Sequence, residues 1–136
     1  MADLWLTLGY GTSPLLPGQL AERGYDVWLG HNRGTPFSNF NKNDVGEPGW
    51  TEKEHWDFSW ADMGKYDIPA FIELIREETG KPKVTIMGYS QGGAQIFYAL
   101  ATNQDWYAER VHRFVSLAGC HFASNRADSD FDNYEV

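Results

Sequence analysis

The chain has 136 residues, enough for one domain of modest size. Apolar residues make up 42% of it and aromatic residues 15%, so the composition is that of a globular protein and not of a disordered one. Eleven basic and nineteen acidic residues give a formal net charge of −8, which disfavours binding to nucleic acid or to an anionic membrane. A single cysteine, Cys120, leaves no intrachain disulfide, and no apolar run approaches the length of a membrane span.

In the first part of the chain, short and weakly marked secondary-structure elements precede a long loop. Residues 1–14 lack the basic segment that opens a signal peptide, so none is expected here, and the localisation stays open. The stretch "LLPGQLAERG" predicts a short helix that ends at Gly24, and "YDVWLG" is then expected to be a buried strand. A polar loop dotted with aromatic residues follows from Arg33 to Phe58, and loops of this length are often functional.

The best-marked element is a helix that starts near Ser59. Ser59 and Asp62 have the spacing of a capping box. Gly80 is suited to end the helix, whereas Pro69, inside it, should kink or divide it. Its apolar residues recur at helical spacing along one face: Ile68, Phe71, Ile72 and Ile75.

The second half alternates between strand and helix patterns. Residues 83–89 predict a strand, 91–102 a helix and 111–119 a second strand. This alternation indicates an α/β fold with a mostly parallel sheet and helices on both faces, here over residues 1–122. The acidic segment 123–136 is expected to be a poorly ordered tail. Because sites in such sheets lie at the carboxyl ends of strands, three segments should share one rim: "GHNRG", "GYSQGG" and "GCHFAS".

The "GYSQGG" segment has the Gly-x-Ser-x-Gly pattern of a nucleophile elbow, a sharp turn between a strand and a helix. Ser90 would take a strained backbone conformation and act as a nucleophile. Gly88 and Gly92 would support the elbow by avoiding clashes where strand and helix cross, and the backbone N–H of Gln91 would stabilise an oxyanion. The alternative is a glycine-rich turn without chemistry, since the pattern is short.

Three stretches carry a family resemblance: "GYDVWLGHNRG", "HWDFSWADMGKYDIPAFIELI" and "VTIMGYSQGG". Over roughly residues 15–120 the chain resembles the gastric and lysosomal acid lipases of the α/β-hydrolase fold. The resemblance implies a serine carboxylester hydrolase of lipid catabolism, which acts on acylglycerols or sterol esters through an acyl-enzyme on Ser90. It implies a neutral lipid ester as substrate and no cofactor. His31 departs from the pattern, because the family more often has asparagine there.

The resemblance also implies parts that this chain lacks. Related lipases, which are commonly secreted or lysosomal, have a His-Gly oxyanion segment, a cap region and a triad acid and base. In this fold the acid precedes the histidine and both follow the serine. After Ser90 the histidines are His112 and His121, and the acidic residues at 128–132 come too late. A partial α/β-hydrolase is expected, so a catalytically incomplete fragment or a non-catalytic binding paralogue remains the alternative function.

The remaining histidines and the cysteine favour structural roles. His121 follows the last strand and could substitute as a base, but a surface histidine is the more common outcome. His112 and His55 are expected to be structural, and the four histidines are too scattered for a metal site. Cys120 is expected to be a buried small residue.

A structural role is also the more common interpretation for two charged residues and for the aromatic residues of the loop. Arg33 is expected to form an ion pair, and Asp67 to anchor a helix or loop, because it precedes the serine. The loop aromatics either contact a lipid surface or, more commonly, pack onto their own domain. They are Phe37, Phe40, Trp50, Trp56, Phe58 and Trp60.

Overall fold

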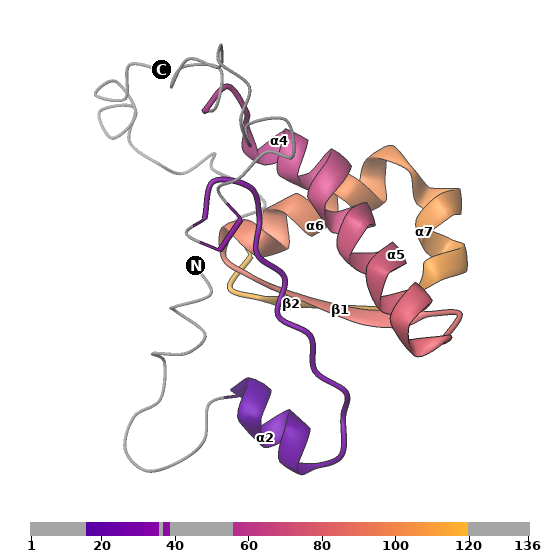
Figure 1. Cartoon of the computed structure of the whole chain (residues 1–136). Coiled ribbons are helices and arrows are strands. Elements are labelled where there is room, and N and C mark those ends of the chain that lie inside the picture. The colour runs from indigo at the N-terminus through magenta and orange to yellow at the C-terminus, as the bar shows by residue number, and fades with distance from the viewer. Residues whose placement is uncertain (1–15, 36, 39–55, 120–136) are drawn as a thin grey trace, which may run out of the picture.

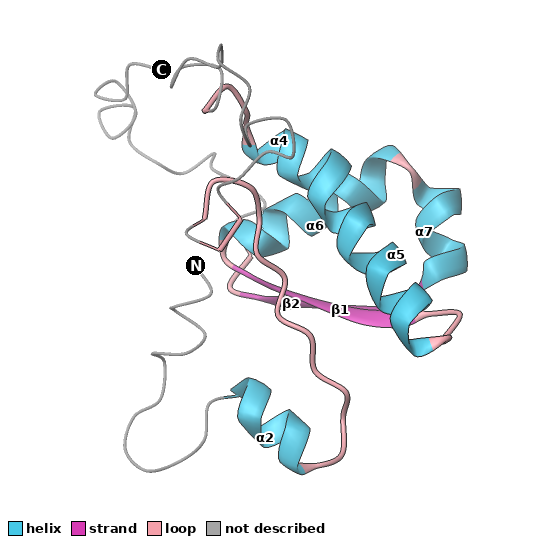
Figure 2. Cartoon of the chain, in the orientation of Figure 1, coloured by secondary structure: helices cyan, strands magenta, loops and turns pink. Residues whose placement is uncertain are grey.

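A computed structural model of the chain describes residues 16–35, 37–38 and 56–119. Helices alternate with a pair of strands in the second half of the chain, as Figures 1 and 2 show. The helices and strands, in chain order, are α2 (Leu16–Glu22), α4 (Trp60–Asp62), the π-helix η1 (Met63–Asp67), α5 (Ile68–Thr79), β1 (Val84–Tyr89), α6 (Gln91–Thr102), α7 (Gln104–Arg110) and β2 (Val111–Leu117).

The first described segment is partly as predicted. Helix α2 ends before Gly24, which has a left-handed φ of 86°. The buried strand predicted at "YDVWLG" is wrong, because residues 25–30 form no strand and Tyr25 is 64% exposed. A strand needs a hydrogen-bonded neighbour, and the described sheet contains only β1 and β2.

The capped helix forms where the sequence predicts it. The backbone N–H and the hydroxyl of Ser59 both donate to Asp62 Oδ2 at 2.8 Å, which starts the helix at Trp60. Gly80 ends it in the left-handed conformation, with φ 66°, and its N–H donates to the carbonyl of Arg76.

Pro69 divides this helix, as predicted. It has no N–H to donate to the preceding turn, and the five residues before α5 form the π-helix η1. The N–H of Ile68 accordingly donates to the carbonyl of Met63, five residues back. The wider turn therefore absorbs the proline while the chain stays helical from Trp60 to Thr79.

Strands β1 and β2 pair in parallel, in a register that joins Ile86 to Phe114 and Tyr89 to Leu117. They are connected by α6 and by α7, a seven-residue helix that the sequence analysis did not predict. A parallel pair with a helical crossover confirms the α/β class.

One face of the strand pair carries the core. Helices α5, α6 and α7 supply its buried members, which are Ile68, Ile72, Ile96, Ala99 and Tyr107. Val84 and Ile86 of β1 pack against this cluster, whereas the alternating Thr85 and Met87 are exposed. Helix α2 lies on the other side of the strands in Figure 1 and buries no residue. In the described part of the chain, the expected cover by helices on both faces is therefore present on one face only.

Among the described residues, no helix is both long enough and apolar enough to cross a membrane.

Candidate functional site

Ser90 lies at a sharp turn between β1 and α6. Strand β1 ends at Tyr89, α6 begins at Gln91, and Ser90 between them has φ 52° and ψ −121°. Non-glycine residues rarely take a positive φ, and such a conformation costs about 1–3 kcal/mol. The strained backbone that an elbow requires is therefore present at Ser90.

Neighbouring backbone groups hold this conformation. The N–H of Ser90 donates to the carbonyl of Leu117 at 2.9 Å, at the end of β2. The carbonyl of Ser90 accepts from the N–H groups of Gly93 and Ala94, at 3.0 and 3.3 Å, which closes the first turn of α6. The turn is thus fixed from the sheet on one side and from the helix on the other.

Two glycines let the strand and the helix approach closely. A Cβ on Gly88 would lie 2.6 Å from both the carbonyl oxygen of Gly92 and the nitrogen of Gly93. A Cβ on Gly93 would lie 3.1 Å from the Cα of Gly119, just after β2. A Cβ on Gly92 would meet no heavy atom within 4 Å among the described residues, and the supporting role expected for Gly92 stays a prediction.

The first N–H groups of α6 face the turn that carries Ser90. Gln91 is the first residue of α6, and the leading N–H groups of a helix have no acceptor within the helix. They carry the positive end of the helix dipole, which favours a developing negative charge nearby. The arrangement is suited to an oxyanion donor at Gln91, and that role stays a prediction.

The rim beside Ser90 is partly described. Ala118 follows β2 with a φ of 47°, so the chain turns sharply directly after Leu117. The parallel pairing of β1 with β2 brings Ser90 and Gly119, the first residue of the "GCHFAS" segment, to the same edge of the sheet. Cys120 and His121 lie outside the described residues, and so does His55.

The turn at 31–35 is held by the ion pair between Arg33 and Asp67. Asp67 Oδ1 accepts from Arg33 Nε at 2.8 Å and lies 2.7 Å from Nη2, while Oδ2 accepts from the backbone N–H of Arg33 at 2.9 Å. Asp67 is 8% exposed, so three contacts compensate a buried carboxylate. Both structural expectations, an ion pair for Arg33 and an anchor at Asp67, are confirmed.

A second contact of this turn was not foreseen. Asn32 Nδ2 donates to Gln95 Oε1 at 2.7 Å, and Gln95 Nε2 lies 2.9 Å from Met63 Sδ. Gln95 is 1% exposed. The sequence feature that could have indicated this contact is the amide of Gln95, which stands in the otherwise small and apolar stretch "GGAQIF" at a position that faces the core.

The described histidines do not form a metal site. His31 packs against Phe37 with ring centroids 4.8 Å apart, and its Nδ1 is buried without a hydrogen-bond partner among the described residues. His112 is exposed at the amino end of β2, at the far end of the strand from Leu117. Within the described segments, no three histidine, cysteine, aspartate or glutamate side chains lie close enough together to bind a metal ion.

The loop aromatics have mixed environments. Phe58 and Trp56 lie against the 31–35 turn, because a Cβ on Gly34 would come within 2.8 Å of both rings. Phe37 and Trp56 nevertheless remain 67% and 51% exposed. Packing onto the domain is therefore confirmed for Phe58, while Phe40 and Trp50 lie outside the described residues.

A shallow cavity of about 430 Å³ lies away from Ser90, between η1, the end of α6 and α7. Tyr107 lines it and is 3% exposed, and burial raises its pKa to about 12. Its other lining residues are Gly64, Lys65, Pro69, Tyr98, Thr102, Asn103 and Trp106. None of these residues belongs to the turn at Ser90.

Comparison with known proteins gives consistent similarities. A family described as having the alpha/beta hydrolase fold matches residues 9–134. The chain is 38% identical over 135 residues to a probable lipase of Schizosaccharomyces pombe, covering 99% of this chain and 28% of that protein. It is 43% identical to the gastric triacylglycerol lipase of Mus musculus and 40% identical to lipase member K of the same species, over 73% of this chain and 24% of each protein. No solved structure is significantly similar.

These similarities have a defined extent. The chain spans about a quarter of the length of the curated relatives it matches. The resemblance to acid lipases is confirmed over that part.

Proposed function

Because the chain belongs to the α/β-hydrolase fold family, we propose that it carries the nucleophile elbow of a serine carboxylester hydrolase that acts on neutral lipid esters. Ser90 is the proposed nucleophile. Its strained backbone, fixed between the end of β1 and the start of α6, is the observation that carries the proposal.

The proposed reaction is acyl transfer. The hydroxyl of Ser90 attacks the ester carbonyl, and its proton passes to a base. The carbonyl oxygen becomes an oxyanion that the N–H of Gln91 stabilises at the start of α6. The tetrahedral intermediate then expels the alcohol, which takes up the proton, and leaves an acyl-enzyme that water hydrolyses.

We assign neither the acid nor the base of a triad to a residue of this chain. In this fold both follow the serine along the chain. Among the described residues after Ser90, His112 lies at the opposite end of β2, too far along the strand to accept a proton from the elbow. The acidic residues at 128–132 and His121 lie outside the described residues.

The name of one relative supports the proposed substrate class. The gastric enzyme of Mus musculus is named as a triacylglycerol lipase and is 43% identical over the shared part. We therefore propose acylglycerols or sterol esters as substrates, with a peripheral contact to a lipid surface through the exposed aromatic side chains near Trp56 and Trp60.

A non-catalytic role is the second candidate. The observation that favours it is the position of the described histidines, because His31 is packed on Phe37 and His112 lies at the far strand end. In that case the strained turn would serve only the close packing of β1 on α6.

Turnover of a short-chain ester separates the two candidates. Imidazole added to the solution can supply the base that Ser90 needs. We expect the chain to hydrolyse p-nitrophenyl butyrate faster than its Ser90→Ala variant, by a margin that grows with the imidazole concentration. Equal rates for the two proteins at every imidazole concentration would favour the non-catalytic role.

A further inference from the structure

The largest fully buried side chains in the described part of the chain are those of Ile72 and Gln95, and of these two only Gln95 is polar. It lies on α6 next to Ile96, whose side chain belongs to the apolar core. An amide at such a position costs free energy unless its donors and acceptor are satisfied. Both ends of the Gln95 side chain have partners, Asn32 and Met63, and the two partners come from different segments.

These contacts close a triangle between three segments. Asn32 joins the 31–35 turn to α6, and Met63 joins α6 to η1. Asp67, the last residue of η1, joins η1 back to the turn through Arg33. Each segment is therefore fixed by two others.

The triangle lies near the elbow. Gln95 lies in α6, five residues after Ser90, which directly precedes this helix, and five helical residues span about 7.5 Å along the helix axis. The backbone of α6 also touches η1 here, because a Cβ on Gly64 would lie 2.8 Å from the carbonyl oxygen of Gln95. The 31–35 turn thus lies over the second turn of the helix whose first turn supports Ser90.

We propose that Gln95 is a positioning residue that sets where the 31–35 turn lies relative to the Ser90 elbow, and so shapes the substrate side of the site. The catalytic consequence rests on the proposed function; the positioning itself does not. Gln95 touches no reacting atom and acts through Asn32.

The chemistry of an amide explains why glutamine suits this position. An apolar side chain of similar size would fill the same space beside Ile96, but it would accept no hydrogen bond from Asn32. A buried polar contact specifies one arrangement of its partners because every alternative leaves a group unsatisfied. Gln95 therefore fills space in the core and, through its hydrogen bond with Asn32, also favours one position of the 31–35 turn.

The experiment compares Gln95→Leu, Asn32→Ala and the double variant in the full chain. Three quantities are measured: stability in urea, amide hydrogen exchange, and the rate at which a fluorophosphonate labels Ser90 in the presence of imidazole. The exchange of the amides of residues 33–35 reports on the turn, and that of α5 reports on the core. Gln104→Leu, which changes an exposed glutamine on α7, is the matched control.

If Gln95 is a positioning residue, stability in urea should respond differently from hydrogen exchange and from the labelling rate. Gln95→Leu and Asn32→Ala should each raise exchange at 33–35 by about 10-fold relative to α5 and slow the labelling. The double variant should regain stability, because neither partner is left unpaired, but not the protection or the labelling rate. The control should match the original chain in all three.

A merely structural role predicts otherwise. If the double variant restores protection and labelling together with stability, or if Gln95→Leu leaves exchange at 33–35 unchanged, the inference is overturned. Should Gln95→Leu fail to fold, Asn32→Ala, which leaves the core intact, decides the same question. Absent labelling of the original chain would contradict the proposed function alone, because hydrogen exchange still decides the positioning.

Discussion

The backbone N–H of Ser90 donates to the carbonyl oxygen of Leu117 at 2.9 Å, so the residue that follows β1 is held by the last residue of β2. This bond ties the strained serine to the sheet rather than to its own helix alone. The elbow geometry therefore depends on the pairing of both strands and on the close approach of α6 to β1.

The close approach predicts different effects for two glycines of one motif. Gly88→Ala should lower the free energy of unfolding by about 2–3 kcal/mol, because its Cβ would lie 2.6 Å from backbone atoms that cannot move independently. Gly92→Ala, the matched control, should be neutral or stabilising by up to about 1 kcal/mol, because it lies in α6 with open space around it. Urea unfolding measures both, and equal losses would contradict the account of the elbow.

The pair of Arg33 and Asp67 should be worth more than an exposed ion pair. Asp67→Ala leaves the half-buried guanidinium and a backbone N–H of Arg33 without their acceptor, and we expect a loss of about 2–3 kcal/mol. Urea unfolding measures the loss.

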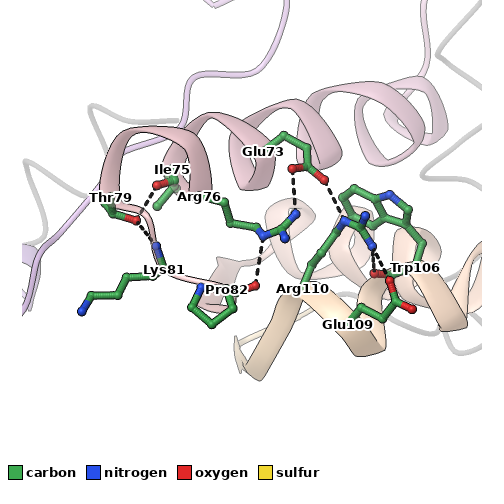
Figure 3. Close-up of polar contacts among 9 residues, drawn as sticks. All are labelled: Glu73, Ile75, Arg76, Thr79, Lys81, Pro82, Trp106, Glu109 and Arg110. Atoms are coloured by element: carbon green, nitrogen blue, oxygen red, sulfur yellow. Dashed lines mark hydrogen bonds and ion pairs between the residues drawn. The ribbon is translucent and has the colours of Figure 1, made fainter.

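The control for that substitution is Glu73→Ala. Figure 3 shows that Glu73 accepts from both Arg110 and Arg76. Both hydrogen bonds are 2.7 Å long, but the Glu73 side chain is 47% exposed. Exposed pairs contribute about 1 kcal/mol or less. A loss for Glu73→Ala as large as that for Asp67→Ala would show that burial does not govern these pairs.

The capping contact predicts a pH dependence at low pH. Hydrogen bonds from the backbone N–H and then from the hydroxyl of Ser59 hold the pKa of Asp62 below its usual value. A depressed native pKa stabilises the fold above the unfolded pKa of the carboxyl, and this contribution is lost as the pH falls through the native pKa. Asp62→Asn should therefore be less stable than the original chain at pH 7, with a difference that shrinks as the pH falls below about 4. Thermal unfolding across this range measures it, and a difference independent of pH would count against the capping role.

Tyr107 predicts an effect of the opposite sign at high pH. Burial raises its pKa to about 12, and its hydroxyl has no hydrogen-bond partner among the described residues. A raised native pKa means that the contribution to stability is present below the unfolded pKa and is lost as the pH rises from about 10 to about 12. Tyr107→Phe should remove this loss and should stabilise the chain at pH 7 by up to about 1 kcal/mol. Destabilisation at pH 7 would indicate that the hydroxyl is satisfied in solution, by water in the adjoining cavity.

Short sequence patterns predicted those features that depend on contacts between residues close together in the chain. The contact between Ser59 and Asp62, the division of the helix at Pro69 and the left-handed Gly80 each depend on a few neighbouring residues, and all three form as expected. The strand at 25–30 failed for the opposite reason. Its apolar residues meet the composition of a buried strand, but a strand also requires a neighbour, which composition does not supply.

The candidate site divides in the same way. The pattern around Ser90 gave the strained turn, because strand, serine and small-residue helix are consecutive in the chain. The contact of Asn32 with Gln95 joins residues 63 positions apart, and nothing local marks either as the other's partner. The close approach of Gly93 to Gly119 likewise joins residues that are far apart in the sequence, and the motif that contains Gly93 does not indicate it.

The most direct test of the central claim is the site of covalent modification by a fluorophosphonate. The chain would be treated with the reagent in the presence of imidazole, digested and analysed by tandem mass spectrometry, with Ser90→Ala in parallel. An elbow nucleophile predicts one adduct, on Ser90, formed faster than on any other serine and absent from the variant. An adduct spread over several serines, or equal modification of the original chain and the variant, would contradict the assignment of Ser90 as the nucleophile.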